Sequence, residues 1–261
     1  MKTYTDQMNS TIRLESAPRR IVSLVPSQTD LFHHLGLEDE VVGITKFCIS
    51  PNEWFRSKTR VGGTKSIDIE KVKTLKPDLI IGNKEENSID DIKVLEEVAP
   101  VWMSDIYTLE DAIEMIRLLS DIMKVSDKAE SLIKDIDAGF KKLNNLTSEG
   151  STKSVLYYIW KDPGMVSGKN TFVDDMLSKC GLVNASNIER YPVIEELEDD
   201  PDLIFLSSEP FPFKEIHMGE FQTKFPKSKI VLVDGEMFSW YGSKLKDAPF
   251  YFSKLIGDLR H

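Results

Sequence analysis

The sequence contains little cysteine and little histidine. Of its 261 residues two are cysteines, Cys48 and Cys180, which lie far apart and form no CxxC motif. This excludes a disulfide framework and a cysteine-rich metal site. No two histidines are four residues apart, the helical spacing that directs two imidazoles at one ion. The four histidines are His33, His34, His217 and His261. We therefore expect no resident metal site.

Positive charge and long apolar segments are also scarce. Lys and Arg number 33 against 43 Asp and Glu, a net charge of −10, which is the wrong sign for binding phosphate backbones or anionic lipid. Apolar runs such as residues 155–160 have the length of a strand and fall far short of the roughly 20 residues that span a bilayer. The first seven residues contain no apolar segment of a signal peptide. The sequence as given therefore predicts a soluble chain without an export signal.

The common motifs of phosphate binding and nucleophilic catalysis are missing as well. The sequence has no GxGxxG, GxxxxGK[ST] or GxSxG segment, so it lacks both the glycine-rich phosphate cradle and the nucleophile elbow. Ser27, with Asp30 three residues later, is typical of a helix N-cap, and residues 62–65 are interpreted as a turn. We assign no catalytic residue and do not expect an enzyme.

Short β-branched segments alternate with amphipathic ones, which predicts an α/β fold with mostly parallel strands. The clearest helical pattern follows the fourth strand, with Ser126 as N-cap and apolar residues at three- and four-residue spacing. We predict an N-terminal lobe at 1–124, a linking helix at 125–147 and a C-terminal lobe at 148–261. The expected strands are residues 21–25, 41–45, 79–82, 101–105, 154–160, 203–207 and 230–234.

Three segments of the first lobe recur in the second in the same order. The segments of the first pair are each predicted to be a helix end followed by a glycine at C′. Those of the second pair are each a Pro-Asp dipeptide that leads into a buried strand, and those of the third pair are each a strand. Three matches in register predict duplicated lobes. The pairs are residues 30–37 with 175–182, 77–81 with 201–205, and 101–105 with 230–234.

The loops expected at the carboxyl ends of the strands form the candidate binding site, because ligands of open α/β sheets bind there. Aromatic side chains with a few polar groups and lysines suit a bulky, partly apolar and in part anionic small molecule. For Trp160 and Trp240, packing in the core is the alternative interpretation. The acidic run at residues 195–200 is predicted to be a solvated helix face, since it lacks the ligand order of a calcium loop. The candidate ligand-binding residues are Ser27, Gln28, Phe47, Thr64, Lys65, Trp160, Gly168, Lys169, Trp240 and Tyr241.

Several of these segments resemble the substrate-binding proteins of ABC importers for vitamin B12 and iron chelates. The resemblance runs from about Ala17 to Leu259. It implies two Rossmann-like lobes with mostly parallel sheets joined by one long α-helix, the architecture of class III periplasmic binding proteins, and a ligand held between the lobes without covalent chemistry. The segments that carry it are residues 17–30 (APRRIVSLVPSQTD), Val61-Gly62-Gly63 leading into 75–80, and Val166-Ser167-Gly168-Lys169 leading into Cys180-Gly181.

The resemblance implies a cobalt- or iron-containing chelate as ligand, and it leaves corrinoid, ferric siderophore and haem open. Phe47 and the Trp240 loop match positions where the cobalamin binders place aromatic residues beside the corrin. Thr64 stands where those binders have a further pocket tryptophan, which weighs against a corrinoid. An anionic iron chelate is favoured by lysines of the same loops, Lys65, Lys169 and Lys244.

An ABC permease and ATPase complex is the partner that the resemblance implies, together with a monomeric chain and a periplasmic or cell-surface location. Glu85 and Glu209 each stand eight residues after the proline of a matching strand. The resemblance implies that one glutamate of each lobe contacts the permease, and Glu86 or Asp90 could serve in place of Glu85. Because the sequence predicts no export signal, the alternative is an intracellular two-lobe α/β enzyme or chelate-handling protein.

Overall fold

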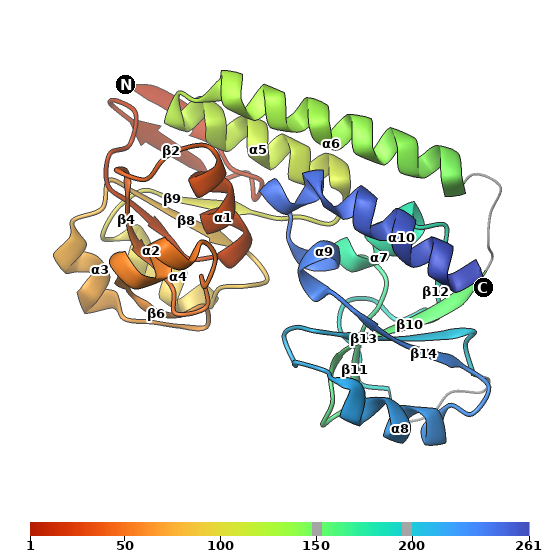
Figure 1. The fold of residues 1–261 in the computed structure, drawn as a ribbon. Helices are drawn as coiled ribbons and strands as arrows, with labels where there is room; N and C mark the ends of the chain where they lie inside the picture. Colours follow the sequence, from red (N-terminus) through yellow and green to blue (C-terminus); the bar gives the residue numbers. More distant parts are fainter. Residues whose placement is uncertain (148–152, 195–199, 261) are drawn as a thin grey trace. The chain divides into compact units, whose positions relative to one another are not determined.

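The structure is a computed structural model that describes residues 1–147, 153–194 and 200–260. Its chain divides into two compact units, each with its own sheet (Figure 1). The acidic run predicted as a helix face lies, at residues 195–199, outside the described residues. Unit 1 comprises residues 1–106, 110–134 and 241–243, and unit 2 comprises residues 107–109, 135–240 and 244–261.

Unit 1 is built on a five-stranded parallel sheet in the order β5-β4-β3-β8-β9. Strands β3, β8 and β9 are buried along their whole length, as is usual for parallel strands, which helices cover. The elements up to the end of this unit's sheet are β1 Lys2–Thr5, β2 Thr11–Leu14, β3 Ile21–Ser23, α1 Pro26–His34, β4 Val41–Ile44, α2 Asn52–Ser57, β5 Thr59–Arg60, β6 Gly62–Gly63, β7 Ser66–Ile67, α3 Ile69–Leu75, β8 Leu79–Asn83, α4 Ile89–Glu96 and β9 Val101–Ser104.

Two antiparallel hairpins in unit 1, β1–β2 and β6–β7, were not predicted from the sequence. The turn of the first hairpin binds the edge strand β9. The Gln7 N–H donates to the Met103 carbonyl at 3.1 Å, and the Met103 N–H donates to Asp6 Oδ2 at 3.2 Å. Asp6 is 5% exposed, and this burial raises the pKa of its carboxyl. The hairpin therefore covers part of an edge that would otherwise be open to other strands.

Unit 2 is built on strands in the order β11-β10-β13-β14, with β12 also paired to β10. β11 is antiparallel to β10, whereas β12 and β13 are parallel to it. Because side chains alternate across a sheet, Tyr158 packs on Phe221 and Tyr157 on Phe238, with ring centroids 4.7 and 5.2 Å apart. The elements after β9 are α5 Leu109–Met123, α6 Ser126–Thr147, β10 Ser154–Trp160, β11 Met165–Ser167, α7 Phe172–Lys179, β12 Val183–Asn184, β13 Leu203–Ser207, α8 Glu215–Lys224, β14 Lys229–Val233, α9 Gly235–Ser239, η1 Ser243–Lys246 and α10 Ala248–Arg260.

The seven predicted strands are all present, and their observed ends lie within two residues of the predicted ones. The α/β class with mostly parallel sheets is therefore confirmed. The 22-residue helix α6 begins one residue after the predicted start at 125 and ends at the predicted residue. Nowhere in the described part of the chain is a helix long and apolar enough to cross a bilayer.

Helix α6 belongs to both units, because the division between them falls after Lys134. Its first part packs in unit 1, where Lys128 donates to the Leu35 carbonyl at 2.8 Å. Its second part packs in unit 2 beside α10 (Figure 1), and Gly139 of α6 approaches Pro249 of α10 there. A β-carbon at Gly139 would lie 2.9 Å from the proline ring, so the two helices approach closely at this point.

The predicted repeat is reproduced at the ends of α1 and α7. Gly36 and Gly181 follow these helices with φ angles of 74° and 71°, the left-handed region that glycine adopts without steric cost. Leu37 and Leu182 then each donate a backbone N–H five residues back, to Phe32 and Leu177, both at 3.0 Å. The two ends share one Schellman-type geometry.

The Pro-Asp pairs of the repeat also have one structural role. Asp78 accepts the backbone N–H groups of Arg19 and Arg20 at 2.7 and 2.9 Å, just before β3. Asp202 accepts the N–H of Ser154 at 2.7 Å, at the start of β10. Each carboxylate therefore holds the backbone at the beginning of the neighbouring parallel strand in its sheet.

The N-cap prediction for Ser27 is wrong. Helix α1 begins at Pro26, and Val25 is the N-cap residue. Proline suits the first helical position, because its φ is already helical and the N–H it lacks would have no partner there. Ser27 therefore lies inside the first turn and is 4% exposed.

Candidate ligand-binding site

The carboxyl end of unit 1's sheet presents exposed apolar side chains. Phe47 and Ile49 follow β4 and are 50% and 56% exposed. The ammonium of Lys46 lies 5.1 Å from the centre of the Phe47 ring. A β-carbon at Gly63 would lie 3.3 Å from that ring, so the small residue in β6 leaves room for it. This part of unit 1 offers the aromatic surface that the sequence predicted at Phe47.

Ser27 and Gln28, by contrast, are enclosed in unit 1. Gln28 is completely buried and donates from Nε2 to Ser104 Oγ at 2.7 Å. Gly242, from the segment 241–243 that also belongs to unit 1, covers Ser27: a β-carbon there would lie 2.7 Å from the Ser27 carbonyl oxygen. In this arrangement neither side chain offers a ligand much surface, and their binding role stays a prediction.

Thr64 and Lys65 form the turn of the β6–β7 hairpin, which is tied to the loop after β8. The Lys65 ammonium donates to the carbonyls of Glu85 and Asn87. The Asn87 side-chain amide in turn donates to the Thr64 carbonyl at 3.1 Å. Much of the hydrogen-bonding capacity of this lysine is therefore used within unit 1.

Trp160 is an exposed aromatic residue at a strand end of unit 2. It ends β10, is 41% exposed, and donates its indole N–H to the Asp162 carbonyl at 3.0 Å. One edge meets Phe211 in a T-shaped contact with centroids 5.7 Å apart. The side chain is thus held in place while a large part of it remains exposed, as stacking on a ligand requires.

Trp240 and Tyr241 are buried, at 6% and 7% exposure. The Trp240 indole donates to Glu209 Oε1 at 2.9 Å, and the Lys244 ammonium lies 5.4 Å from the ring centre. Lys244 itself pairs with Glu236 at 2.8 Å. The burial and hydrogen bond of Trp240 match packing in the core, which was the alternative interpretation of this residue from the sequence.

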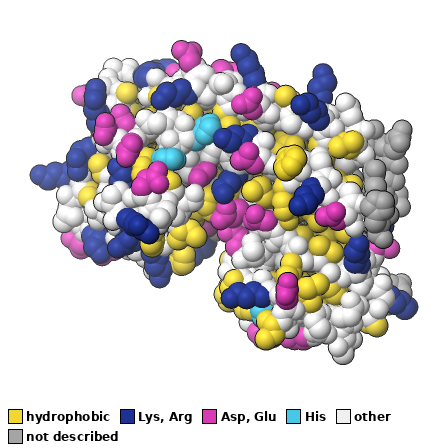
Figure 2. Space-filling model, in the orientation of Figure 1, with side chains coloured by type: hydrophobic (Ala, Val, Ile, Leu, Met, Phe, Trp, Pro, Cys, Tyr) yellow, Lys and Arg dark blue, Asp and Glu magenta, His cyan; other side chains and the backbone are white. Residues whose placement is uncertain are grey.

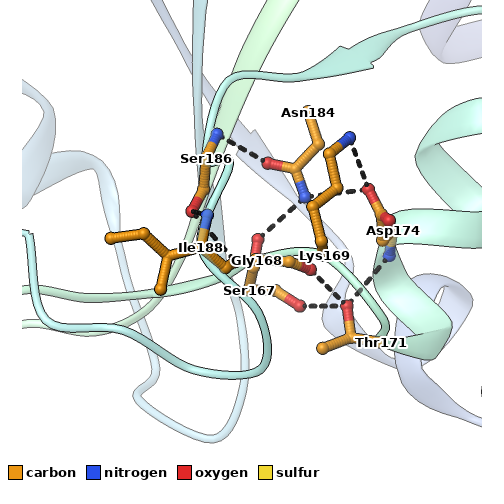
Figure 3. Close-up of polar contacts among 8 residues, drawn as sticks. All are labelled: Ser167, Gly168, Lys169, Thr171, Asp174, Asn184, Ser186 and Ile188. Carbon is orange, nitrogen blue, oxygen red and sulfur yellow. Dashed lines mark hydrogen bonds and ion pairs between the residues drawn. The ribbon is translucent and has the colours of Figure 1, made fainter.

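Gly168 and Lys169 belong to a polar network at the start of α7 (Figure 3). Lys169 Nζ lies 3.3 Å from Asp174 Oδ1, which also accepts from the Asn184 amide at 3.0 Å. Thr171 caps α7 by accepting the Asp174 N–H at 3.1 Å. A β-carbon at Gly168 would lie 2.0 Å from the Ile188 carbonyl oxygen, so glycine is required there for close backbone approach.

Glu85 and Glu209 occupy equivalent local positions in their units. The Glu85 N–H donates to Asn83 Oδ1 at 2.8 Å, and the Glu209 N–H donates to Ser207 Oγ at 3.3 Å. In each case the acceptor is the last residue of the strand that follows the Pro-Asp pair. The two glutamates that correspond in the sequence repeat therefore also occupy corresponding backbone positions in their own units.

The Glu209 carboxyl is half-buried and already bonded. Its Oε1 accepts from the Ser239 hydroxyl as well as from the Trp240 indole. Burial raises the pKa of Glu209, the nearby Glu236 carboxylate raises it further, and the two donated hydrogen bonds oppose the shift. Its carboxylate thus organises the segment after β14.

Exposed apolar residues beside β11 were missed in the sequence. Ile188, Tyr191 and Val193 are 57%, 37% and 43% exposed. They lie in an irregular segment that hydrogen-bonds to β11, for example from the Val166 N–H to the Pro192 carbonyl at 3.0 Å. The segment has no strand or helix periodicity, so pattern analysis had no signal for it.

The cysteines are enclosed in the two units. Both are free and buried, and burial raises the pKa of each thiol. Cys48 contacts the hydroxyls of Thr29 and Thr45 at 3.1 and 3.2 Å. Among the residues with described positions, no three His, Cys, Asp or Glu side chains gather in a way that could hold a metal ion.

Residues 21–228 match the model of the periplasmic binding protein family. The match covers most of the chain, with all of unit 1's five-stranded sheet and every strand of unit 2's sheet except β14, so the chain belongs to this family.

Two curated proteins illustrate the relationship. The uncharacterized ABC transporter substrate-binding lipoprotein YvrC of Bacillus subtilis strain 168 is 30% identical over 192 residues, 70% of this chain and 60% of that protein. The chain thus matches less than two thirds of that relative's length. A vitamin B12-binding protein of Vibrio cholerae is 26% identical over 194 residues, 72% of this chain and 70% of that protein.

The fold is also found in solved structures. The siderophore-binding protein BauB, solved with ferric iron and two acinetobactin molecules, superposes with a TM-score of 0.80 at 16% identity, covering 98% of each chain. At this identity the likeness concerns the fold alone. It confirms the predicted architecture of a class III periplasmic binding protein.

Proposed function

We propose that this protein is the substrate-binding component of an ABC importer and that it binds a metal chelate through the loops at the carboxyl ends of its two sheets. The family match over residues 21–228 carries this proposal. The half-exposed rings of Phe47 and Trp160 support it, because each ends or follows a strand where α/β proteins bind ligands. A carrier of this kind needs no catalytic residue.

For the ligand we propose a corrinoid first, with haem and ferric siderophores as the other members of the class. The lysines that favoured an anionic chelate have partners within their own units: Lys169 pairs with Asp174, Lys244 with Glu236, and Lys65 with backbone carbonyls. They therefore offer an anion less charge than their number suggests, which supports a large ring with apolar faces. Thr64, in place of an aromatic residue, is the feature that argues the other way.

A thermal-shift screen with cobalamin, cobinamide, haem and ferric siderophores tests the ligand class. A ligand at 100 times its dissociation constant stabilises the fold by about 2.7 kcal/mol. Binding of none of these chelates would contradict the proposal.

Two variants then locate the site. We expect Phe47→Ala and Trp160→Ala each to weaken binding about tenfold, or about 1.4 kcal/mol, as stacked aromatic contacts are lost. Phe250→Ala is the matched control, since Phe250 is an 80% exposed aromatic on α10. Equal losses in all three variants would point to a nonspecific effect and away from these loops.

We further propose that Glu85 and Glu209 dock the loaded protein on the importer, outside the cytoplasmic membrane. Their equivalent backbone positions support this role, because two charges on a rigid body set orientation as well as affinity. The double variant Glu85→Gln/Glu209→Gln keeps the hydrogen-bond acceptors and removes both charges. We expect unchanged ligand affinity and reduced importer-dependent uptake, with Glu70→Gln on α3 as control. Full uptake by the double variant would instead favour docking by Glu86 or Asp90, whereas uptake that does not depend on this protein at all would favour an intracellular chelate-handling protein.

A further inference from the structure

Unit 2 contains a cavity of about 390 Å³ beside α7 and β12. All of its lining residues belong to this unit. The cavity includes Lys169, one of the candidate ligand-binding residues, but it lies away from Trp160, the exposed ring of the proposed chelate surface in this unit. Asn184 of β12 pairs with Val155 at the start of β10, whereas Trp160 ends that strand. Five residues of strand separate the two, about 16 Å.

The charges around the cavity are balanced. Lys169 pairs with Asp174 at 3.3 Å, and these two groups are 37% and 22% exposed (Figure 3). Asp175 accepts the Leu109 N–H at 2.8 Å and faces Lys179 at 3.9 Å. The N-terminus of α7 is already capped by Thr171. A free anion would meet two carboxylates, and a free cation would meet an ammonium, so neither charge class is favoured.

The remaining capacity of the lining is for hydrogen bonds. An ammonium has three donors, and Asp174 is the one ion-pair partner of Lys169 within the described residues. Asn170 donates a hydrogen bond from Nδ2 to Glu189 at 2.7 Å. The oxygen of the same side-chain amide is a hydrogen-bond acceptor. Donors and acceptors therefore lie side by side, the pattern that hydroxyl groups match because each hydroxyl both donates and accepts.

The cavity is also lined by one aromatic side chain, Tyr107, which is held in place. The Arg190 guanidinium lies 5.0 Å from the centre of the Tyr107 ring and donates to the Asn170 carbonyl at 2.9 Å. Leu182 lies on the same cavity and is 6% exposed. Ligand pockets of small molecules begin at roughly 300 Å³. The volume thus suits a ring of a few carbons with polar substituents and is small for an intact corrinoid.

We propose that this cavity is a second ligand site of the protein and that it takes a neutral, hydroxyl-rich molecule of monosaccharide size. The site goes beyond the proposed chelate function and does not depend on it. Lys169 and Asp174 bind hydroxyls of the ligand, and the Tyr107 side chain contacts its carbon skeleton.

The test is an NMR titration of the full chain with D-glucose, D-ribose and myo-inositol as probes. We expect saturable shifts of the Asn170 and Asn184 side-chain amides with at least one probe. Lys169→Met should weaken that binding about tenfold. Lys161→Met is the matched control, because Lys161 is ion-paired to Glu220 at 2.8 Å and does not line the cavity.

A second variant keeps the test decisive if Lys169→Met disturbs the network. Val183→Trp places a bulky side chain at the half-exposed edge of the cavity without touching the ion pair, and we expect it also to abolish the saturable shifts. The proposal is overturned if none of the three probes saturates, if phosphate or ammonium shifts the amides more strongly, or if both variants bind as wild type does.

Discussion

Gln28 is a polar residue that the fold uses as a structural link. Its amide reaches Ser104 Oγ at 2.7 Å, and Ser104 also accepts from the Asn83 amide at 3.0 Å. The three side chains join α1, β8 and β9 at the ends of the sheet. A buried hydrogen-bonded amide of this kind stabilises mainly because its loss leaves partners unsatisfied.

We predict that Gln28→Ala destabilises unit 1. The truncation leaves a small cavity and removes a donor from Ser104, at a cost of about 1–3 kcal/mol. In urea unfolding, this loss of stability should lower the midpoint concentration while the dependence of the unfolding free energy on urea concentration stays the same. An unchanged midpoint would show that this network contributes nothing to stability.

Glu209 makes stability depend on pH. Burial raises the pKa of this carboxyl above its ordinary value, so the folded chain holds the proton more tightly than the unfolded one. The free energy of unfolding is therefore highest at pH values below the pKa of the unfolded chain, where the carboxyl is protonated in both states. It falls as the pH rises through the pKa of the folded chain. Each unit of raised pKa corresponds to about 1.4 kcal/mol.

Glu209→Gln is therefore expected to be more stable than wild type at neutral pH. The amide oxygen still accepts from Trp240 and Ser239, while the cost of burying a charge disappears. Melting temperatures measured from pH 4 to 7 should diverge in favour of the variant as pH rises. Parallel curves would mean that the carboxyl titrates alike in both states.

At the scale of elements, the paired helix ends of α1 and α7 predict paired mutational effects. Gly36→Ala and Gly181→Ala should each destabilise by about 1 kcal/mol, because a β-carbon is strained at their positive φ. Gly219→Ala, inside α8 with open space around it, should instead stabilise by about 0.5–1 kcal/mol. Denaturant unfolding of the three variants checks both signs, and a loss at Gly219 equal to the others would contradict the argument.

At the scale of the whole molecule, charge predicts a monomer. The net charge is −10, and like charge opposes self-association. Figure 2 shows both positive and negative side chains on the face that it displays. Light scattering after gel filtration should give the chain mass of 29.7 kDa at low and at physiological salt. A mass of twice that value at micromolar concentration would refute this.

The chain passes between its two units more often than the sequence suggested. The predicted organisation has one crossing, at the long helix. The structure has residues 107–109 in unit 2 and residues 241–243 in unit 1. Ser243 donates its hydroxyl to Asp30 of α1, which anchors the second of these segments. No local pattern marks such a segment, because three residues carry no periodicity.

The binding residues show where sequence analysis of the site stops. Phe47 and Trp160 were predicted as site residues and are exposed, whereas Gln28 and Trp240 were predicted in the same way and are buried. All four lie at or near strand ends, and the strand-end rule cannot separate them. Their exposure depends on which other segments of the unit cover each loop.

The sequence alone determined the α/β class, the seven principal strands, helix α6 and the paired glycine-ended helices. These features follow from side-chain periodicity and from residues such as Gly36 and Gly181 that act within one turn of the chain. Only the tertiary structure decided which polar groups became core. The partner of Gln28 lies 76 residues away, and that of Trp240 lies 31 residues away. Local pattern sets backbone conformation, whereas burial and hydrogen-bond partners depend on contacts between segments distant in the chain.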